Sequence, residues 1–229
     1  MSLLSVVKDV CAFVGVTVPT TVFGGIGGNR TMQEMLALAN EVTRRISYDT
    51  REWTRLKLPC VFVGDDVTTA WPLPANYKRM LLTSNVWSSM QSQTPMLFIP
   101  DTDQWMQRRA AGRTDGRGEW TLLGGAMHIY PPLPVGATAS FAYLAKDIIA
   151  LNGGGLGDAF QNDADVFVLD ERLLKLGMVW QWKAHKGSPY AEDMGSFSDA
   201  LVIAMGNDQP SPIIIGRGGL YNVEATPWP

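Results

Sequence analysis

The chain has 229 residues, of which 46% are hydrophobic and 18% are charged, proportions typical of globular proteins rather than of disordered chains. Its formal net charge of -3 argues against a dedicated nucleic-acid binder with a broad basic face. A chain of this length buries enough apolar surface to fold without disulfides or metals. These numbers favour a soluble, partner-binding protein with one elaborated domain or two small ones.

Cysteine and histidine are scarce, with two of each in the whole chain, which is too few for a four-ligand zinc site. Cys11 and Cys60 lie in apolar surroundings, so we expect buried thiols in a reducing compartment rather than a disulfide. The N-terminus lacks the pattern of a secretory leader, and no apolar run reaches the roughly 18 residues of a membrane span. We therefore expect a protein made and kept in aqueous solution, without a membrane partner.

The N-terminal part of the chain carries two helical patterns. Apolar residues recur every three or four positions over residues 3–14 and predict a short helix. Residues 17–29 contain one proline and four glycines, which predicts a loop. A second apolar stripe predicts a long helix over residues 32–53, opened by a capping box of Thr31 and Glu34.

The middle of the chain changes to the alternation of extended strands. From Leu56 to Ala145, short apolar runs are separated by turn formers, which predicts a small antiparallel β unit. The exception is the stretch 101–111, where a capping residue precedes a short helix that carries two arginines. A hairpin is predicted over residues 119–130, with its turn at Gly124-Gly125.

Helical periodicity returns over residues 169–187 and again over 189–206. Helices at both ends with strands between them predict an α+β protein. We expect a helical bundle with an inserted small antiparallel β subdomain and an extended C-terminal tail. The expected domains are the bundle (1–55 and 165–206), the β subdomain with its short helix (56–150) and the tail (207–229).

Motifs for phosphate binding are incomplete. Four glycines between Phe23 and Arg30 precede a helix, where backbone amides can hold an anion. The pattern departs from Gly-x-Gly-x-x-Gly at its last glycine and lacks Gly-Lys-Ser/Thr, so a loop is favoured over a nucleotide site. We predict no cofactor.

Candidate catalytic side chains also lack an organised pattern. His128 and His185 have no carboxylate and nucleophile arranged around them in the sequence. Glu34, Asp49 and Glu52 offer acids for a glycosidase-type pair, but a solvated helix face is the simpler interpretation. The aromatic and basic stretch from Trp180 to Lys186 resembles a nucleic-acid surface, and packing of Trp180 in the helix's apolar side is the favoured alternative. We predict no catalytic residue and no metal ligand.

Three segments together resemble phage head-to-tail adaptor proteins, the head-completion or tail accessory factors that dock beneath the portal. The match covers about residues 30 to 205, and its third segment is the most specific. The segments are 32–56, 71–80 (Trp-Pro-Leu-Pro-Ala-Asn-Tyr-Lys-Arg-Met), and 169–187 followed by 190–193 and 200–201, supplemented by Ile129-Tyr130-Pro131-Pro132.

The resemblance implies a structural virion protein rather than an enzyme. It would be a homo-oligomeric ring of about twelve copies, made in the host cytoplasm and located at the head-to-tail interface. The portal protein would lie above it, a nozzle, stopper or tube protein of the tail below it, and double-stranded DNA would pass through its lumen. The mildly acidic charge is compatible with this role, because such a lumen would not grip the passing DNA.

Two enzymatic alternatives stay open at this point. Some adaptor-type proteins are associated with cell-wall hydrolysis, so a peptidoglycan hydrolase of the virion is the main alternative, although no residue matches a catalytic motif for it. A soluble enzyme whose site is assembled from distant loops is the other.

The tail after Asn207 has the composition of a partner-binding segment. Its four prolines and three glycines disfavour a helix, while its apolar side chains offer anchors. We expect it to be mobile in the monomer and ordered against portal or a neighbouring subunit, with the isoleucines pairing with a partner's sheet edge; simple disorder is the alternative. The predicted partner-binding residues are Ile213, Ile214, Ile215, Arg217, Leu220, Tyr221 and Trp228.

Overall fold

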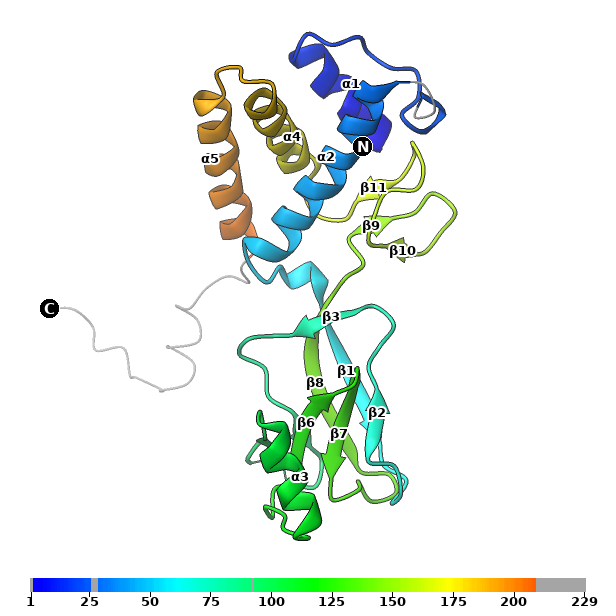
Figure 1. The fold of residues 1–229 in the computed structure, drawn as a ribbon, viewed down its shortest axis with the longest axis vertical. Helices are drawn as coiled ribbons and strands as arrows, with labels where there is room; N and C mark the ends of the chain where they lie inside the picture. The colour runs from blue at the N-terminus through cyan, green and yellow to red at the C-terminus, as the bar shows by residue number, and fades with distance from the viewer. Residues whose placement is uncertain (1, 26–28, 92, 209–229) are drawn as a thin grey trace, which may run out of the picture. The chain divides into compact units, whose positions relative to one another are not determined.

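The computed structural model describes residues 2–25, 29–91 and 93–208, which group into two compact units (Figure 1). Within these ranges, the helical unit comprises the residues up to Thr54, Ile149–Gly155 and the residues from Ala159 on. The β unit comprises Arg55–Ile148 and Leu156–Asp158.

The helical unit is organised around α4 (Glu171–His185), which packs against α1 (Leu3–Phe13), α2 (Arg30–Arg44) and α5 (Ala191–Asn207) (Figure 1). Three of these helices begin behind a polar side chain that accepts a backbone N–H of the first turn, which satisfies a donor that the helix leaves free. These caps are Ser2 for α1, Asn29 for α2 and Asp170 for α4.

A glycine allows the helices to approach closely. A Cβ atom built on Gly177 of α4 would lie 2.5 Å from Cγ1 of Val42 and 3.3 Å from a ring carbon of Phe197. Since real Cβ atoms do not approach so near, a larger residue at this point would push α2 or α5 away from α4.

The second predicted helix begins and ends earlier than its apolar stripe indicates. Its cap is Asn29, whose side chain accepts the N–H of Thr31 at 3.0 Å, so the predicted Thr31 capping box is wrong. Glu34 instead accepts a hydrogen bond from Arg30. The α-helix stops at Arg44 and continues as a π-helix, η2 (Arg45–Asp49).

Short secondary-structure elements complete the helical unit. They are the 3₁₀ turn η1 (Phe23–Gly25) and an antiparallel pair of β9 (Ile149–Ala150) with β11 (Val166–Phe167); a further 3₁₀ turn, η3 (Thr54–Leu56), leads into the β unit. The buried carboxylate of Asp165 accepts the backbone N–H groups of Asn152, Gln161 and Asn162, which holds the loops around this pair.

The β unit contains two four-stranded sheets. Sheet A has the order β1-β8-β3, with β4 also pairing with β8, and all of these pairs are antiparallel. Its strands are β1 (Lys57–Val63), β3 (Tyr77–Met80), β4 (Trp87–Ser88) and β8 (Thr138–Ala145).

Sheet B has the order β2-β7-β6-β5. The predicted hairpin is confirmed as β6 and β7, while β5 and β6 run parallel. Its strands are β2 (Ala70–Pro72), β5 (Leu97–Phe98), β6 (Glu119–Leu123) and β7 (Ala126–Tyr130). The unit also holds α3 (Thr102–Ala110), which lies against β6, and β10 (Leu156–Gly157).

The two sheets enclose one hydrophobic core. Sheet A contributes large side chains such as Phe62 and Phe141, and sheet B contributes Trp120, Met127 and Ile129. Each sheet therefore packs one face on this core.

The predicted fold class is wrong. The described residues form a mixed α/β protein with five α-helices and three β-sheets, not a helical bundle with a small antiparallel insertion. Local periodicity identified most strands one by one, but it did not indicate that they assemble into two sheets around a core of their own or that one pair is parallel. The expected extended tail lies outside the described residues, apart from Asn207 and Asp208, which end α5.

Candidate functional site

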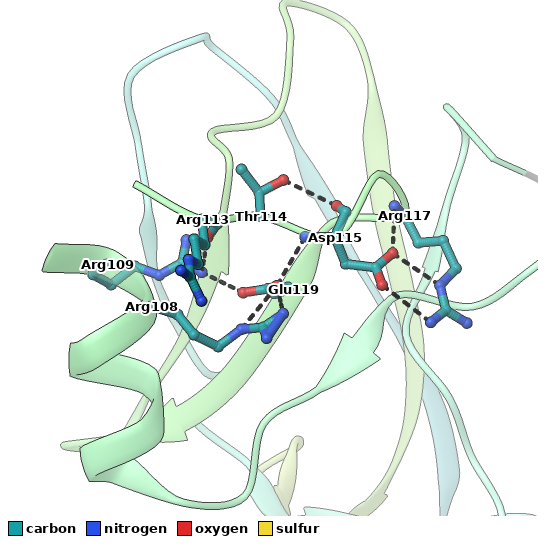
Figure 2. Close-up of polar contacts among 7 residues, drawn as sticks. All are labelled: Arg108, Arg109, Arg113, Thr114, Asp115, Arg117 and Glu119. Atoms are coloured by element: carbon teal, nitrogen blue, oxygen red, sulfur yellow. Dashed lines mark hydrogen bonds and ion pairs between the residues drawn. The ribbon is translucent and has the colours of Figure 1, made fainter. Parts of the chain in front are cut away.

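A buried carboxylate organises a cluster of charged residues in the β unit (Figure 2). Glu119, the first residue of β6, has a fully buried side chain. Its carboxylate is bound by the guanidinium groups of Arg108 and Arg109, both in the last turn of α3, and it accepts the backbone N–H of Asp115 at 2.8 Å. The carboxylate thus ties α3, the loop after it and sheet B together.

Arg109 lies between aromatic rings. The carbon centre of its guanidinium group is 4.4 Å from the ring centroid of Trp105 and 3.6 Å from that of Tyr130, both cation–π distances. Two of its nitrogens, Nε and Nη1, are buried and have no hydrogen-bond partner among the described residues. Burial lowers the pKa of Arg109 and outweighs the opposing effect of Glu119.

The loop 111–118 closes the cluster with a surface ion pair. Arg117 donates from Nε to Asp115 at 3.0 Å, and this hydrogen bond, together with that from the backbone N–H of Arg117, lowers the pKa of Asp115 to about 2. Every acidic group in Figure 2 therefore already faces at least one arginine. The cluster holds the loop 111–118 in place.

Acidic residues elsewhere follow the same trend. A hydrogen bond from Lys186 lowers the pKa of Glu34, and one from Thr68 lowers that of Asp65. Burial raises the pKa of Asp163, but hydrogen bonds from Thr21 and the backbone outweigh it and lower the pKa overall. A glycosidase general acid needs the opposite shift, because it must keep its proton near neutral pH.

These directions predict how stability depends on pH. Since the carboxyl groups have lower pKa values in the folded chain than in the unfolded chain, each stabilises the fold while ionised. That contribution is present above the unfolded pKa, near 4, and is lost as the pH falls through the folded pKa, about 2 for Asp115. We expect urea denaturation to show a lower free energy of unfolding at about pH 3 than at about pH 6. A chain that becomes more stable on acidification would contradict these directions.

Two of the sequence candidates, Glu34 and His185, line one cavity of about 330 Å³ in the helical unit. The carboxylate of Glu34 is engaged there, because it accepts hydrogen bonds from Lys186 at 2.6 Å and Arg30 at 2.9 Å. Trp182 is buried beneath Lys186, whose Nζ lies 4.6 Å from the ring centroid. Glu34 is therefore an ion-pair partner of Arg30 and Lys186.

The other candidates are dispersed. His128 lies in β7 of the β unit, where it pairs with Thr121 and Ala70 in the ladder. Asp49 lies in η2 and lines a separate cavity of about 320 Å³, whereas Glu52 lies in the loop after η2. The structure therefore does not bring the three acids to one cavity.

Trp180 of α4 packs against apolar neighbours, as predicted. The ring centroid of Trp180 lies 6.2 Å from that of Phe197 and 6.3 Å from that of Tyr190. The indole N–H of Trp180 is buried and has no hydrogen-bond partner among the described residues. Packing between α4 and α5 thus accounts for this side chain.

The start of the glycine-rich loop is held by a protein carboxylate. Asp163 accepts the backbone N–H groups of Val22 and Phe23 at 2.9 and 3.1 Å and the hydroxyl of Thr21. These donors are the kind that a phosphate would need. The interpretation as a loop is supported here, and residues 26–28 lie outside the described ranges.

Another open cavity, of about 770 Å³, lies between α1 and the start of α4. Asp9 and Lys175 form an ion pair of 2.8 Å at its wall. The remaining lining residues are Val6, Leu169, Asp170, Glu171, Arg172 and Leu176.

Both cysteines are free thiols, as expected. Cys11 is buried and Cys60 half-buried, and burial raises the pKa of each thiol, which keeps it protonated near neutral pH. Within residues 2–25, 29–91 and 93–208, no group of three His, Cys, Asp or Glu side chains is placed to hold a metal ion.

Exposed apolar side chains mark two surfaces that the sequence analysis did not identify. The first is the outward half of α5, where Met194, Val202 and Ile203 are 42%, 69% and 61% exposed. The second is the outer face of sheet A, where Val61 and Val63 of β1 and Trp87 of β4 are 55%, 57% and 42% exposed. The sequence did contain an indication of the second surface, because the alternating pattern of β1 places every other side chain on the outer face of sheet A.

The predicted partner-binding residues, from Ile213 to Trp228, lie outside the described residues. In the described part of the chain, no helix is long and apolar enough to cross a membrane. Comparison with known proteins finds no family model that matches the chain and no curated protein that is similar to it.

Proposed function

We propose that this protein is a structural component of a phage virion, a head-to-tail adaptor. It forms a ring beneath the portal and provides the docking platform for the tail, with DNA passing through the lumen. The observation that carries the proposal is the pair α4 and α5. Its sequence is the most specific part of the resemblance to adaptor proteins, and its second helix exposes large apolar side chains.

The burial of α5 supports self-association. Of its 17 residues, only Ala200 is buried, on the side that faces α4. The opposite half of the helix carries Met194, Val202 and Ile203 together with small residues and the exposed acids Glu192 and Asp199. A neighbouring copy in a ring would remove these exposed apolar side chains from water.

The state of the acidic groups supports a structural rather than a hydrolytic role. Each clear pKa shift among the carboxyl groups of the described residues is downward, caused by hydrogen bonds and cations that hold the ionised form. These groups stabilise loops and helix contacts. Aromatic contacts such as Trp180 with Phe197 and the ion pair of Lys183 with Asp193 at 2.6 Å hold α4 and α5 together, so the two helices can present one surface to a partner.

The proposal is tested by measuring native mass with and without the portal protein of the same virion. We expect Val202→Asp to weaken self-association by about 30-fold or more, which corresponds to about 2 kcal/mol for a central interface residue. Val135→Asp is the matched control, because Val135 is 74% exposed and lies in a loop of the β unit.

Wild-type protein and the control should form the same ring and bind portal. A protein that stays monomeric at all concentrations, alone and with portal, would refute the adaptor function. Equal self-association of Val202→Asp and wild type would show that α5 is not part of the interface.

A further inference from the structure

β1 is an edge strand of sheet A. It pairs with β8 along its whole length, from Lys57 opposite Leu144 to Val63 opposite Thr138, and the order of the sheet places no described strand on its other side. An edge of seven residues with exposed apolar side chains is a template for strand addition, which natural proteins usually block.

The hydrogen bonds of β8 show which residues of β1 face the open edge. Thr138 accepts from the N–H of Ser89 and donates to the hydroxyl of Ser89, so its backbone groups point away from β1. Its partner Val63 therefore directs its own N–H and C=O to the open edge, because bonded and non-bonded pairs alternate in antiparallel sheets. The same holds for Pro59, whose partner Ala142 accepts from Leu81.

The open edge is blunted in its first half only. Lys57 carries a charge, and Pro59 has no N–H to offer. Val61 and Val63 keep both backbone groups, and their side chains lie on the outer face beside β8. Ser140 of β8 pairs with Val61 on one side and with the half-exposed Trp87 of β4 on the other. The second half of β1 thus combines free donors and acceptors with an apolar surface.

We infer that Val61 to Val63 accept Ile213 to Ile215 from the C-terminal segment of a second copy, as an added antiparallel strand. The inference rests on the proposed ring, in which copies stand side by side. A register with Ile215 opposite Val61 and Ile213 opposite Val63 lets these two isoleucines each exchange two backbone hydrogen bonds with β1, and Pro212 falls beyond the paired residues.

The sequence after α5 suits this occupant. Ile213 follows Asp208, the C-cap of α5, by five residues, and a fully extended linker of this length reaches about 17 Å at roughly 3.3 Å per residue. The isoleucines are β-branched, and Pro212 and Gly216 limit the run to the length of the open half of β1. With only Arg217 and Glu224 charged, the segment matches an apolar edge. Three paired residues bind weakly alone, but a ring repeats the contact at high effective concentration.

The test is cross-linking between copies of the full chain. Unlabelled Val63→Cys chains are mixed with ¹⁵N-labelled Ile213→Cys chains, treated with a short bis-maleimide, and analysed by mass spectrometry. We expect at least tenfold more mixed-isotope product than with Met106→Cys, a control at a half-exposed position of α3 in the same unit. Introducing Val61→Pro into the Val63→Cys chain should reduce the product at least fivefold, because it removes a donor at the open edge and none of the bonds to β8.

Native mass of the same samples separates the two proposals. Rings without the mixed-isotope product would overturn the inference and leave the adaptor function standing. An absence of rings would refute the adaptor function. The inference would then fail as well, because the added strand requires a neighbouring copy.

Discussion

Replacing Glu119 by Gln is expected to lower the free energy of unfolding of the β unit by about 3 kcal/mol. The side chain is fully buried and neutralises Arg108 and Arg109, which are 27% and 18% exposed. Glutamine keeps the shape but not the charge, so both guanidinium groups stay largely desolvated without a counterion. Removing one partner of a buried ion pair costs about 3 to 5 kcal/mol, and the partial exposure of the arginines places the effect at the lower end.

Asp115→Asn is the matched control for this prediction. Asp115 lies in the loop before β6 and pairs with Arg117, but both side chains are partly exposed, so we expect a loss below about 1 kcal/mol. Urea denaturation followed by tryptophan fluorescence measures both variants, since Trp105 and Trp120 are buried in this unit. Equal effects of the two substitutions would mean that burial does not decide the strength of the cluster.

Gly64→Ala is expected to destabilise the β unit by about 3 kcal/mol or to prevent its folding. A Cβ at this position would lie 2.3 Å from the carbonyl oxygen of Pro134 and 2.5 Å from that of Leu133. Both neighbours are backbone atoms, so no side-chain rotation relieves the contact. Gly64 also donates its N–H to Ala137 at 2.7 Å, where the chain leaves β1, and the clash would break this closure.

Gly116→Ala provides the comparison. Nothing lies within 4 Å of a Cβ at Gly116, and the same substitution there should change stability by less than about 1 kcal/mol. Thermal unfolding of both variants beside the wild type measures the difference. A Gly64→Ala protein as stable as the wild type would show that the loop carrying Leu133 and Pro134 can move away at little cost.

Several elements were determined by the sequence itself, because their causes lie within a few residues. The helix pattern and cap of α1, α3 and α4 are local, and each begins at or within two residues of the predicted start. The turn between β6 and β7 is local as well: Gly124 and Gly125 adopt φ of 60° and 78°, which glycine tolerates best. The indication that Trp180 packs against apolar neighbours also followed from spacing alone.

Tertiary structure decided where elements stop and what they meet. The apolar stripe of α2 continues to Ile46, but the α-helix ends at Arg44 and widens into η2, where the carbonyl of Ile46 accepts the indole N–H of Trp53. Strand partners are likewise non-local, since β1 pairs with β8 far along the chain and β5 runs parallel to β6. The fold class was wrong for this reason.

The burial of charge and the exposure of apolar groups were also outside the reach of the sequence. The two arginines of α3 were visible on a short helix, but their partner Glu119 appears in the sequence only as the first residue of a strand. Whether an acid is buried depends on what covers the strand, and α3 covers β6. In the same way, alternation places Val61 and Val63 on one face of β1, yet only the order of sheet A leaves that strand at an edge, with free backbone groups beside an apolar surface.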